Sequence, residues 1–260
     1  MGIKRKPTIK NEDVVKKKRR KKKHYLLRFI IILVICVGGY FFLTSHLFDI
    51  TKVEVTGENH YLDKDIIALA NIEESTNLFE LGKKERIRAM KEDPYIKEVS
   101  MKRRPPGTLL IEVIERTEDA GIAYGNSFVL IHRDGMVLSR VDQQPEIPIL
   151  VGMTILNMQP GEALDVKEKR VLENTLLLMD TMEERDLFFK KIDISDVVIK
   201  AYIYDKLICQ GKPENILEAM ENGNLEAVLV DLLAEGIQHG TIHFGGGGYC
   251  SFSPQVPLNN

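Results

Sequence analysis

The stretch DPYIKEVSMKRRPPGTLLIEVIER, residues 93–116, holds a helix stop, a turn and two strand patterns. Pro94 cannot continue a helix, because proline lacks an N–H and restricts the residue before it. The Pro-Pro-Gly at residues 105–107 is typical of a turn. The apolar residues on either side indicate strands from Ile96 to Arg103 and over LLIEVIER. The stretch therefore predicts the end of a helix followed by two paired strands.

The residues before this stretch predict one further strand and two helices. FDITKVEVTGENHYL, residues 48–62, has the alternation of a strand and stops at Gly57. Asp63 is placed to cap a helix that carries Ile66, Ile67 and Ala70 on its apolar side. A second helix, ended by Pro94, carries Ile87, Ala89 and Met90. The order β-α-α-β-β predicts a two-layer module of about seventy residues.

A basic run followed by an apolar run precedes this module: KKKRRKKKHYLLRFIIILVICVGGYFFLTSHLF, residues 16–48. The apolar part, residues 25–45, is long enough as a helix to cross a bilayer of roughly 30 Å and lacks an A-x-A-like cleavage site. We therefore expect an uncleaved anchor. Residues 1–24 contain twelve Lys or Arg against Glu12 and Asp13, which predicts a cytoplasmic tail and an extracytoplasmic remainder. Lys22, Lys23 and Arg28 are expected at the membrane interface, where basic side chains attract anionic lipid rather than nucleic acid.

Residues 118–254 predict a second region, rich in strands and covered by helices. Asp134-Gly135 is a hairpin signal, and residues 167–185 repeat apolar positions at helical spacing. KPENILEAMENGNLEAVLVDLLAEG predicts two helices separated at Asn-Gly, with Gly236 as the final cap. GTIHFGGGGYCSFSP predicts a terminal hairpin, residues 241–244 and 249–253, joined by a flexible turn of four glycines.

Five motifs in this order resemble the FtsQ/DivIB family of bacterial cell-division proteins: VEVTGE (53–58), NLFEL (77–81), residues 93–116, LIHRDGMVL (130–138) and IPILVG (147–152). The resemblance implies an α+β chain with a membrane helix, a POTRA domain over residues 48–117 and an FtsQ/DivIB-type β domain over residues 118–254. Residues 255–260 would form a C-terminal tail.

The resemblance also implies a function. Such a protein is a non-enzymatic scaffold of the division machinery, a single-pass type II membrane protein expected at the septum. It binds DivIC/FtsB-type and FtsL-type partners outside the membrane and helps to assemble and regulate septal wall synthesis. The terminal hairpin stands where the family captures a partner strand, so the implied partner-binding residues are Thr241, Ile242, His243, Phe244, Tyr249, Ser251 and Phe252.

Two other functions and one question about cysteines stay open at this point. A membrane-anchored thiol enzyme acting on cell wall would use Cys250, with His243 nearby in sequence. However, strand alternation predicts Cys250 on the same face as Phe252, in the core. A POTRA chaperone for translocated chains is the third reading. Cys209 and Cys250 are either paired in a disulfide or two buried free thiols. The sequence has no CxxC, HExxH or other cluster with metal-ligand spacing, and the four glycines lack the following Lys and Ser/Thr of a phosphate-binding loop, so we expect no metal or cofactor.

Overall fold

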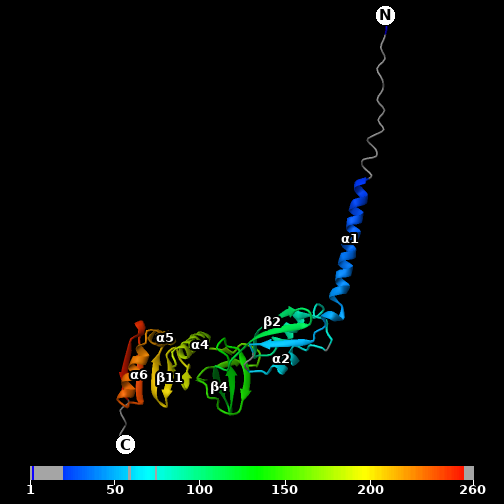
Figure 1. The fold of residues 1–260 in the computed structure, drawn as a ribbon. Helices are drawn as coiled ribbons and strands as arrows, with labels where there is room; N and C mark the ends of the chain where they lie inside the picture. The colour runs from blue at the N-terminus through cyan, green and yellow to red at the C-terminus, as the bar shows by residue number, and fades with distance from the viewer. Residues whose placement is uncertain (1, 3–19, 58–59, 74, 255–260) are drawn as a thin grey trace. The chain divides into compact units, whose positions relative to one another are not determined.

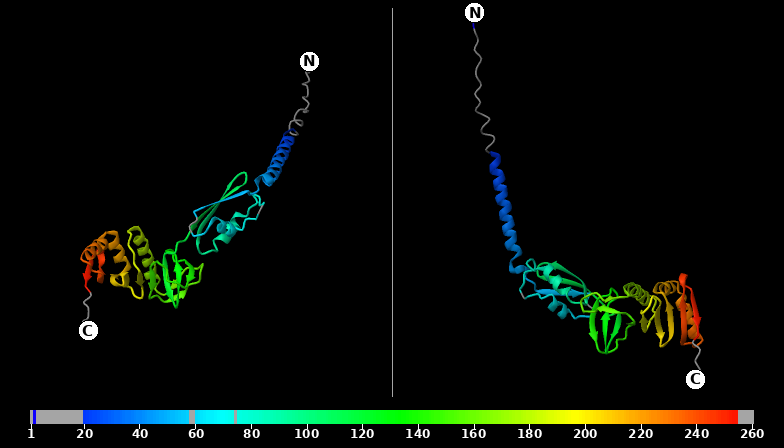
Figure 2. Two further views of the ribbon diagram at one scale, coloured as in Figure 1. Left: turned by 60° about the horizontal axis from the view of Figure 1, so that its bottom comes forward. Right: turned by 180° about the vertical axis from the view of Figure 1, so that it is seen from behind.

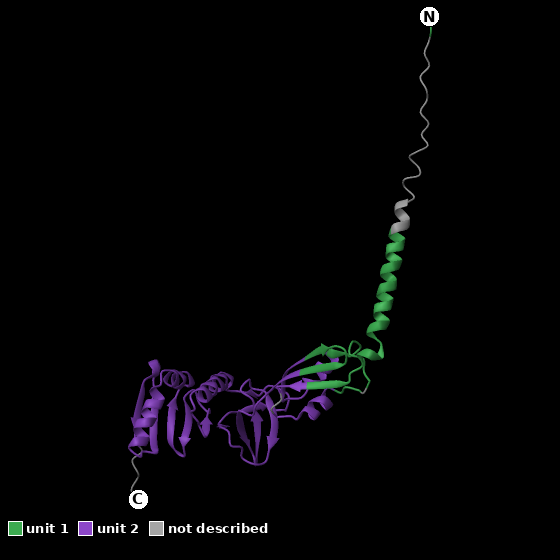
Figure 3. Cartoon of the chain, viewed as in Figure 1, with its two compact units in different colours: residues 1–54, 71–83, 101–111 green, residues 55–70, 84–100, 112–260 purple. Residues whose placement is uncertain are grey.

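The computed structural model describes Gly2 and residues 20–57, 60–73 and 75–254, with the backbone alone for residues 20–24 (Figure 1). The chain divides into two compact units. The first contains residues 1–54, 71–83 and 101–111, and the second contains residues 55–70, 84–100 and 112–260 (Figure 3).

The first helix, α1 (Arg20–Leu43), contains the apolar span. Its 19 residues from Tyr25 to Leu43 have a mean hydropathy of 2.5, and none of this span is buried. By length and composition the span is able to cross a membrane. Arg28 lies within it and is exposed, whereas the side chains of Lys22 and Lys23 are outside the described part of the chain.

The chain leaves α1 through a closely packed segment that we call the membrane joint: residues 42–48 together with Asn77 and Phe79. After the 3-10 turn η1 (His46–Phe48), the Phe48 ring meets those of Phe42 and Phe79 edge to face, with centroids 5.3 and 5.2 Å apart. The buried Asn77 Nδ2 donates to the carbonyl oxygens of Leu43 and Ser45, both at 3.1 Å. The joint thus satisfies a carbonyl that the end of a helix leaves without a partner.

Five elements follow in the predicted β-α-α-β-β order. They are β1 (Lys52–Thr56), α2 (Asp63–Leu69), α3 (Lys83–Met90), β2 (Ile96–Arg104) and β3 (Thr108–Glu115). The three strands form a sheet in the order β1-β3-β2, and each strand has residues in both compact units. The domain boundaries inferred from the sequence remain predictions.

The local sequence explains most of this module, and the structure corrects two details of the prediction. Gly57 has a φ of +88°, and a Cβ there would lie 2.2 Å from the Val113 carbonyl oxygen, so only glycine fits. The carboxylate that accepts a bond at the start of α2 belongs to Asp65, not to Asp63 as predicted, with the Leu62 N–H as donor. Ala89 was predicted on the apolar side of α3 but is exposed, because only one flank of this short helix is covered.

The rest of the chain forms one nine-stranded mixed sheet in the order β14-β13-β12-β11-β10-β7-β4-β5-β6. Its strands are β4 (Ala120–Tyr124), β5 (Ser127–Ile131), β6 (Val137–Val141), β7 (Ile149–Val151), β10 (Lys191–Asp193), β11 (Ile199–Tyr204), β12 (Lys206–Gly211), β13 (His239–Phe244) and β14 (Cys250–Ser253). Strands β4, β5 and β6 are the predicted antiparallel meander, and Gly135 turns between the last two with a φ of +82°. The strands β8 (Ile155–Asn157) and β9 (Asp165–Val166) pair separately.

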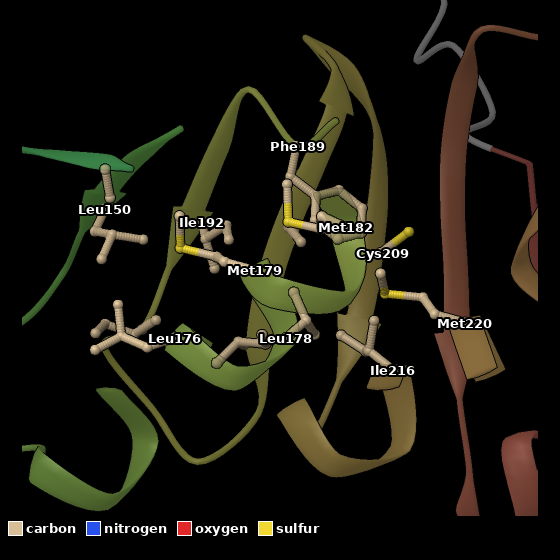
Figure 4. Packing of buried hydrophobic residues seen from close by; sticks show 14 of the residues in the cluster. Leu150, Leu176, Leu178, Met179, Met182, Phe189, Ile192, Cys209, Ile216 and Met220 are labelled. Atoms are coloured by element: carbon tan, nitrogen blue, oxygen red, sulfur yellow. The ribbon is translucent and has the colours of Figure 1, made fainter. Parts of the chain in front are cut away.

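Three helices cover this sheet: α4 (Lys169–Glu184), α5 (Pro213–Glu221) and α6 (Asn224–Ala234). Figure 2 shows α4 and α5 along one side of the strands. As predicted from the spacing, α4 buries Leu172, Leu176, Leu178, Met179 and Met182. Figure 4 shows Met179 and Met182 packed with Phe189 and Ile192, and Ile216 and Met220 of α5 next to Cys209. Gly236 ends α6 with a φ of +68°, also as predicted.

Candidate functional site

The terminal strand β14 forms one edge of the nine-stranded sheet. It pairs antiparallel with β13, and no strand follows it in the sheet among the described residues. The opposite edge is different: next to β6, the Val137 N–H donates to the Glu162 carbonyl at 3.0 Å, and the Gly161 N–H donates to the Val137 carbonyl at 2.9 Å. Among residues 20–57, 60–73 and 75–254, the β6 edge is therefore covered at its start, whereas β14 has no neighbour on its outer side.

The register identifies the backbone groups that point out of the open edge. The Gly245 N–H donates to the Tyr249 carbonyl at 3.0 Å, which makes these two residues a hydrogen-bonded pair. Pairs alternate along an antiparallel ladder, so Cys250 and Phe252 belong to non-hydrogen-bonded pairs. Their N–H and C=O groups point away from β13, toward the side where another strand would add.

Side chains on the hairpin alternate between two faces. Ile242 and Phe244 lie opposite Phe252 and Cys250 in the register, and they share the face that the helices cover. Thr241, His243 and Ser251 lie on the other face. The prediction that Cys250 shares its face with Phe252 and not with Ser251 therefore agrees with the register.

The tetraglycine turn is held in place, which corrects the expectation of a flexible loop. Residues 246–248 form the 3-10 turn η2, and the Gly247 N–H donates to Glu218 Oε2 at 3.0 Å. Asn224 Nδ2 donates to the Gly248 carbonyl at 2.9 Å. Close packing requires glycine at the last position of the turn, because a Cβ on Gly248 would be 2.9 Å from Asn222 Nδ2. The hairpin is thus fixed at its closed end.

The residues implied as partner-binding fall into two groups. Thr241, Ile242, His243 and Phe244 form the interior strand β13, which is paired on both sides, and Ile242 is 0% exposed. Ser251 and Phe252 lie on the edge strand itself, and Tyr249, just before it, is 66% exposed. Among the described residues, β14 and Tyr249 therefore lie at the edge, whereas Ile242 and Phe244 lie on the neighbouring interior strand. Partner binding by these residues remains a prediction.

Cys209 and Cys250 are both free thiols. Cys209 is opposite Ile242, and Ile242 is opposite Phe252, so Cys209 and Cys250 stand two strands apart. Two strand spacings are about 9 to 10 Å, beyond the 4.4–6.8 Å between Cα atoms that is usual for a disulfide. The structure therefore favours two free thiols, of which Cys209 is buried and Cys250 is half-buried rather than buried as predicted.

The thiol-enzyme reading also meets unfavourable geometry. His243 and Cys250 lie on opposite faces of the hairpin, so the imidazole is not placed to act as a base for the thiol. Burial, and secondly the Glu226 carboxylate, raise the pKa of the Cys250 thiol, which lowers its thiolate fraction. Among the described residues, no group of three or more His, Cys, Asp or Glu side chains is arranged to hold a metal.

One residue beside this edge escaped the sequence analysis. Glu226 lies in the first turn of α6, where an acidic residue is unremarkable because it favours the helix dipole. Both of its carboxyl oxygens are shielded from solvent, and neither has a hydrogen-bond partner among the described residues. No local sequence signal predicts this, because the burial of a carboxyl group in the first turn of a helix depends on contacts with other segments of the chain.

Comparison with known proteins identifies the first domain and a set of relatives. A POTRA domain of the FtsQ type matches residues 48–116. The chain is 24% identical over 172 residues to cell division protein DivIB of Clostridium acetobutylicum, which covers 65% of this chain and 69% of the relative. It is 28% identical over 161 residues to cell division protein DivIB of Clostridium botulinum strain Hall (60% and 62%). It is 26% identical over 168 residues to cell division protein FtsQ of Geobacter sp. strain M21 (64% and 60%). The matches thus span about two thirds of these relatives, and the resemblance inferred from the motifs is confirmed.

Proposed function

We propose that this chain, an FtsQ/DivIB-type protein by its POTRA domain and its sequence relatives, acts in cell division as a non-enzymatic scaffold. It binds DivIC/FtsB-type and FtsL-type partners outside the membrane and helps to assemble and regulate septal wall synthesis. The names of the relatives support the cell-division role. The partners come from the resemblance of the terminal hairpin to the family's strand-capturing segment.

The observation that carries the mechanism is the contrast between the two edges of the sheet. At the opposite edge, residues 161–164 pair with residues 135–137 and so cover the start of β6, whereas β14 presents the outward backbone groups of Cys250 and Phe252. An extended segment that adds to such an edge gains main-chain hydrogen bonds, and the side chains beside it provide specificity. Partner capture at β14 is therefore strand addition, and it requires no chemistry from the thiol or the imidazole.

The membrane anchor completes this scaffold. α1 holds the domains at the bilayer, and the basic residues before it favour a cytoplasmic N-terminus. In this type II arrangement the POTRA domain and the nine-stranded sheet lie on the extracytoplasmic side, at the division septum.

Substitution of Cys250 tests the mechanism with a matched pair of variants. Cys250→Pro and Cys250→Ala both remove the thiol, but only proline removes the outward N–H and blocks the edge. Tyr249 already has φ −66° and ψ 131°, the conformation that a residue before proline prefers. We expect Cys250→Pro to weaken binding of the extracytoplasmic segment of a DivIC-type protein by at least about tenfold. Cys250→Ala should bind like the wild type, with both measured on the full chain in detergent micelles.

Three outcomes separate the readings. Equal binding by a folded Cys250→Pro chain would refute strand addition at β14. Loss of a cell-wall-modifying activity in Cys250→Ala would support the thiol enzyme instead. Diffuse protection of backbone amides by bound peptide, in place of protection at β14, would support the chaperone.

A further inference from the structure

Glu226 lies on the flank of α6 that faces the open edge. At 3.6 residues per turn, Glu226, Val230 and Leu233 fall within about 60° of arc. Leu225, Leu229 and Leu232, which point into the core, occupy the neighbouring sector. The Glu226 carboxylate acts electrostatically on the Cys250 thiol, and α6 contacts β14. The flank with Glu226, Val230 and Leu233 is therefore the side of α6 next to β14, and we call it the α6 ledge.

The α6 ledge is apolar apart from Glu226, and its two apolar side chains are exposed, whereas the Glu226 carboxyl oxygens are shielded from solvent. Val230 is 64% exposed and Leu233 is 47% exposed. Large apolar side chains that lie together on a surface mark interaction sites more often than isolated ones do. Figure 1 shows α6 beside the red terminal strand, so the ledge continues the edge proposed above for strand addition.

Helix and strand run in the same direction, which fixes the levels at which their residues meet. Asn224 binds the Gly248 carbonyl at one end, and the chain from α6 returns to His239 near the other end of the hairpin. Four helical residues rise about 6 Å and two strand residues about 6.7 Å. With Glu226 at the level of Cys250, Val230 is at the level of Phe252.

The Phe252 ring leaves room above this part of the edge. It is turned inward over β13: a Cβ on Gly240 would lie 2.5 Å from Phe252 Cε2. The ring is therefore directed away from the outer side of β14, and the ledge residues nearest to this level are Val230 and Leu233. A strand added to β14 would direct alternate side chains into the angle between β14 and the α6 ledge.

A buried carboxylate without a hydrogen-bond partner is costly, and such groups are retained mainly where they serve a function. From this we infer that Glu226 selects the partner: it accepts a hydrogen bond from a Lys or Arg on the incoming strand, at the position opposite Cys250. The residue opposite Phe252, two positions away on the same face, is apolar and packs on Val230 and Leu233. This inference rests on the proposed strand addition and specifies the chemistry of the strand.

The test uses Glu226→Met, which keeps the volume and removes the carboxylate, and Glu235→Gln, which changes an exposed carboxylate just after the same helix. Binding of the extracytoplasmic DivIC-type segment to the full chain in micelles is measured together with thermal unfolding of the chain alone. Glu226→Met should weaken binding about 30-fold or more, because it leaves the partner's cation unpaired. The same variant should raise the unfolding midpoint of the free chain. Glu235→Gln should change neither, and Val230→Asp should weaken binding.

A purely structural role would not move binding and stability in opposite directions. Wild-type affinity of Glu226→Met, or a lower unfolding midpoint, would overturn the inference, since the carboxylate would then be idle or internally paired. If Cys250→Pro abolishes binding while Glu226→Met does not, only this inference fails; if neither weakens binding, strand addition itself fails. Hydrogen exchange of the β14 amides tests whether the chain's own end occupies the edge. Slow exchange in the free chain that becomes rapid after removal of residues 255–260 would identify that end as the occupant and would also overturn the inference. In support, Glu226→Lys should regain affinity for a segment whose Lys or Arg has been changed to Glu.

Discussion

Replacing Asn77 by alanine should loosen the membrane joint without unfolding the protein. The substitution removes two hydrogen bonds from Nδ2 to the Leu43 and Ser45 carbonyls, and a third at 2.9 Å from the Phe79 N–H to Oδ1. Each contributes about 1 kcal/mol net. The loss is therefore about 3 kcal/mol, falling to about 2 where water replaces a partner at the helix end.

Hydrogen exchange on the full chain in micelles measures this effect locally. The Leu78 N–H donates to the Phe48 carbonyl at 2.8 Å and the Phe48 N–H to the Ser45 carbonyl at 3.0 Å, so both amides report on the joint. A loss of 2 to 3 kcal/mol should speed their exchange by about 30- to 150-fold. Amides of β12, in the core of the large sheet, should be unaffected.

The control is Asn126→Ala, at an exposed asparagine in the turn between β4 and β5. Unchanged exchange at Phe48 and Leu78 in a folded Asn77→Ala chain would show that the carboxamide does not hold the joint. Equal acceleration in β12 would show that the change acts on global stability, which also contradicts the argument.

Three further outcomes follow from individual residues. Gly57→Ala should destabilise the chain by more than about 2 kcal/mol in thermal unfolding, because it combines a positive φ with a Cβ 2.2 Å from the Val113 carbonyl oxygen. The control is Gly246→Ala, where nothing lies within 4 Å of the added Cβ. Burial would raise the pKa of Asp119, but hydrogen bonds from His132 and Arg133 hold it well below its usual range. Its contribution to stability is therefore present above about pH 4 and lost as the pH falls, so Asp119→Asn should lower the free energy of unfolding at pH 7 and flatten its decrease toward pH 2. Burial, opposed by a hydrogen bond with Ser139, raises the pKa of Tyr95 to about 12. In a titration followed by phenolate absorbance, Tyr95→Phe should therefore lose the increase that the wild type shows near pH 12.

The sequence predicts those parts of the fold that local signals decide. Pro94, Gly57 and the Pro-Pro-Gly turn are sufficient for the order of the first domain, since each acts on its own neighbours in the chain. The amphipathic spacing of α4 likewise predicts which of its residues are buried. Asp63 and Ala89 were misassigned because a cap and a flank are distinguished by contacts with other segments.

The arrangement of the large sheet lies beyond such signals. The pairing of Ile149 with Lys191, and the parallel pairing of Cys209 with Ile242, join residues more than thirty positions apart. Which strand is interior depends on this order. The sequence could therefore place Cys250 and Phe252 on one face but could not show that β13 is interior and β14 is the edge. Glu226 was missed for the same reason.

The continuity of the nine-stranded sheet determines how the protein would respond to mechanical load. From β14 to β6 there are eight strand spacings, about 38 Å of uninterrupted hydrogen-bonded backbone. The bonds between antiparallel strands run perpendicular to the strand direction. A pull along β14 would load its bonds to β13 in shear, so that they share the force, whereas a pull across the sheet would break them one after another. The protein should therefore withstand tension best when the force is directed along its last strand.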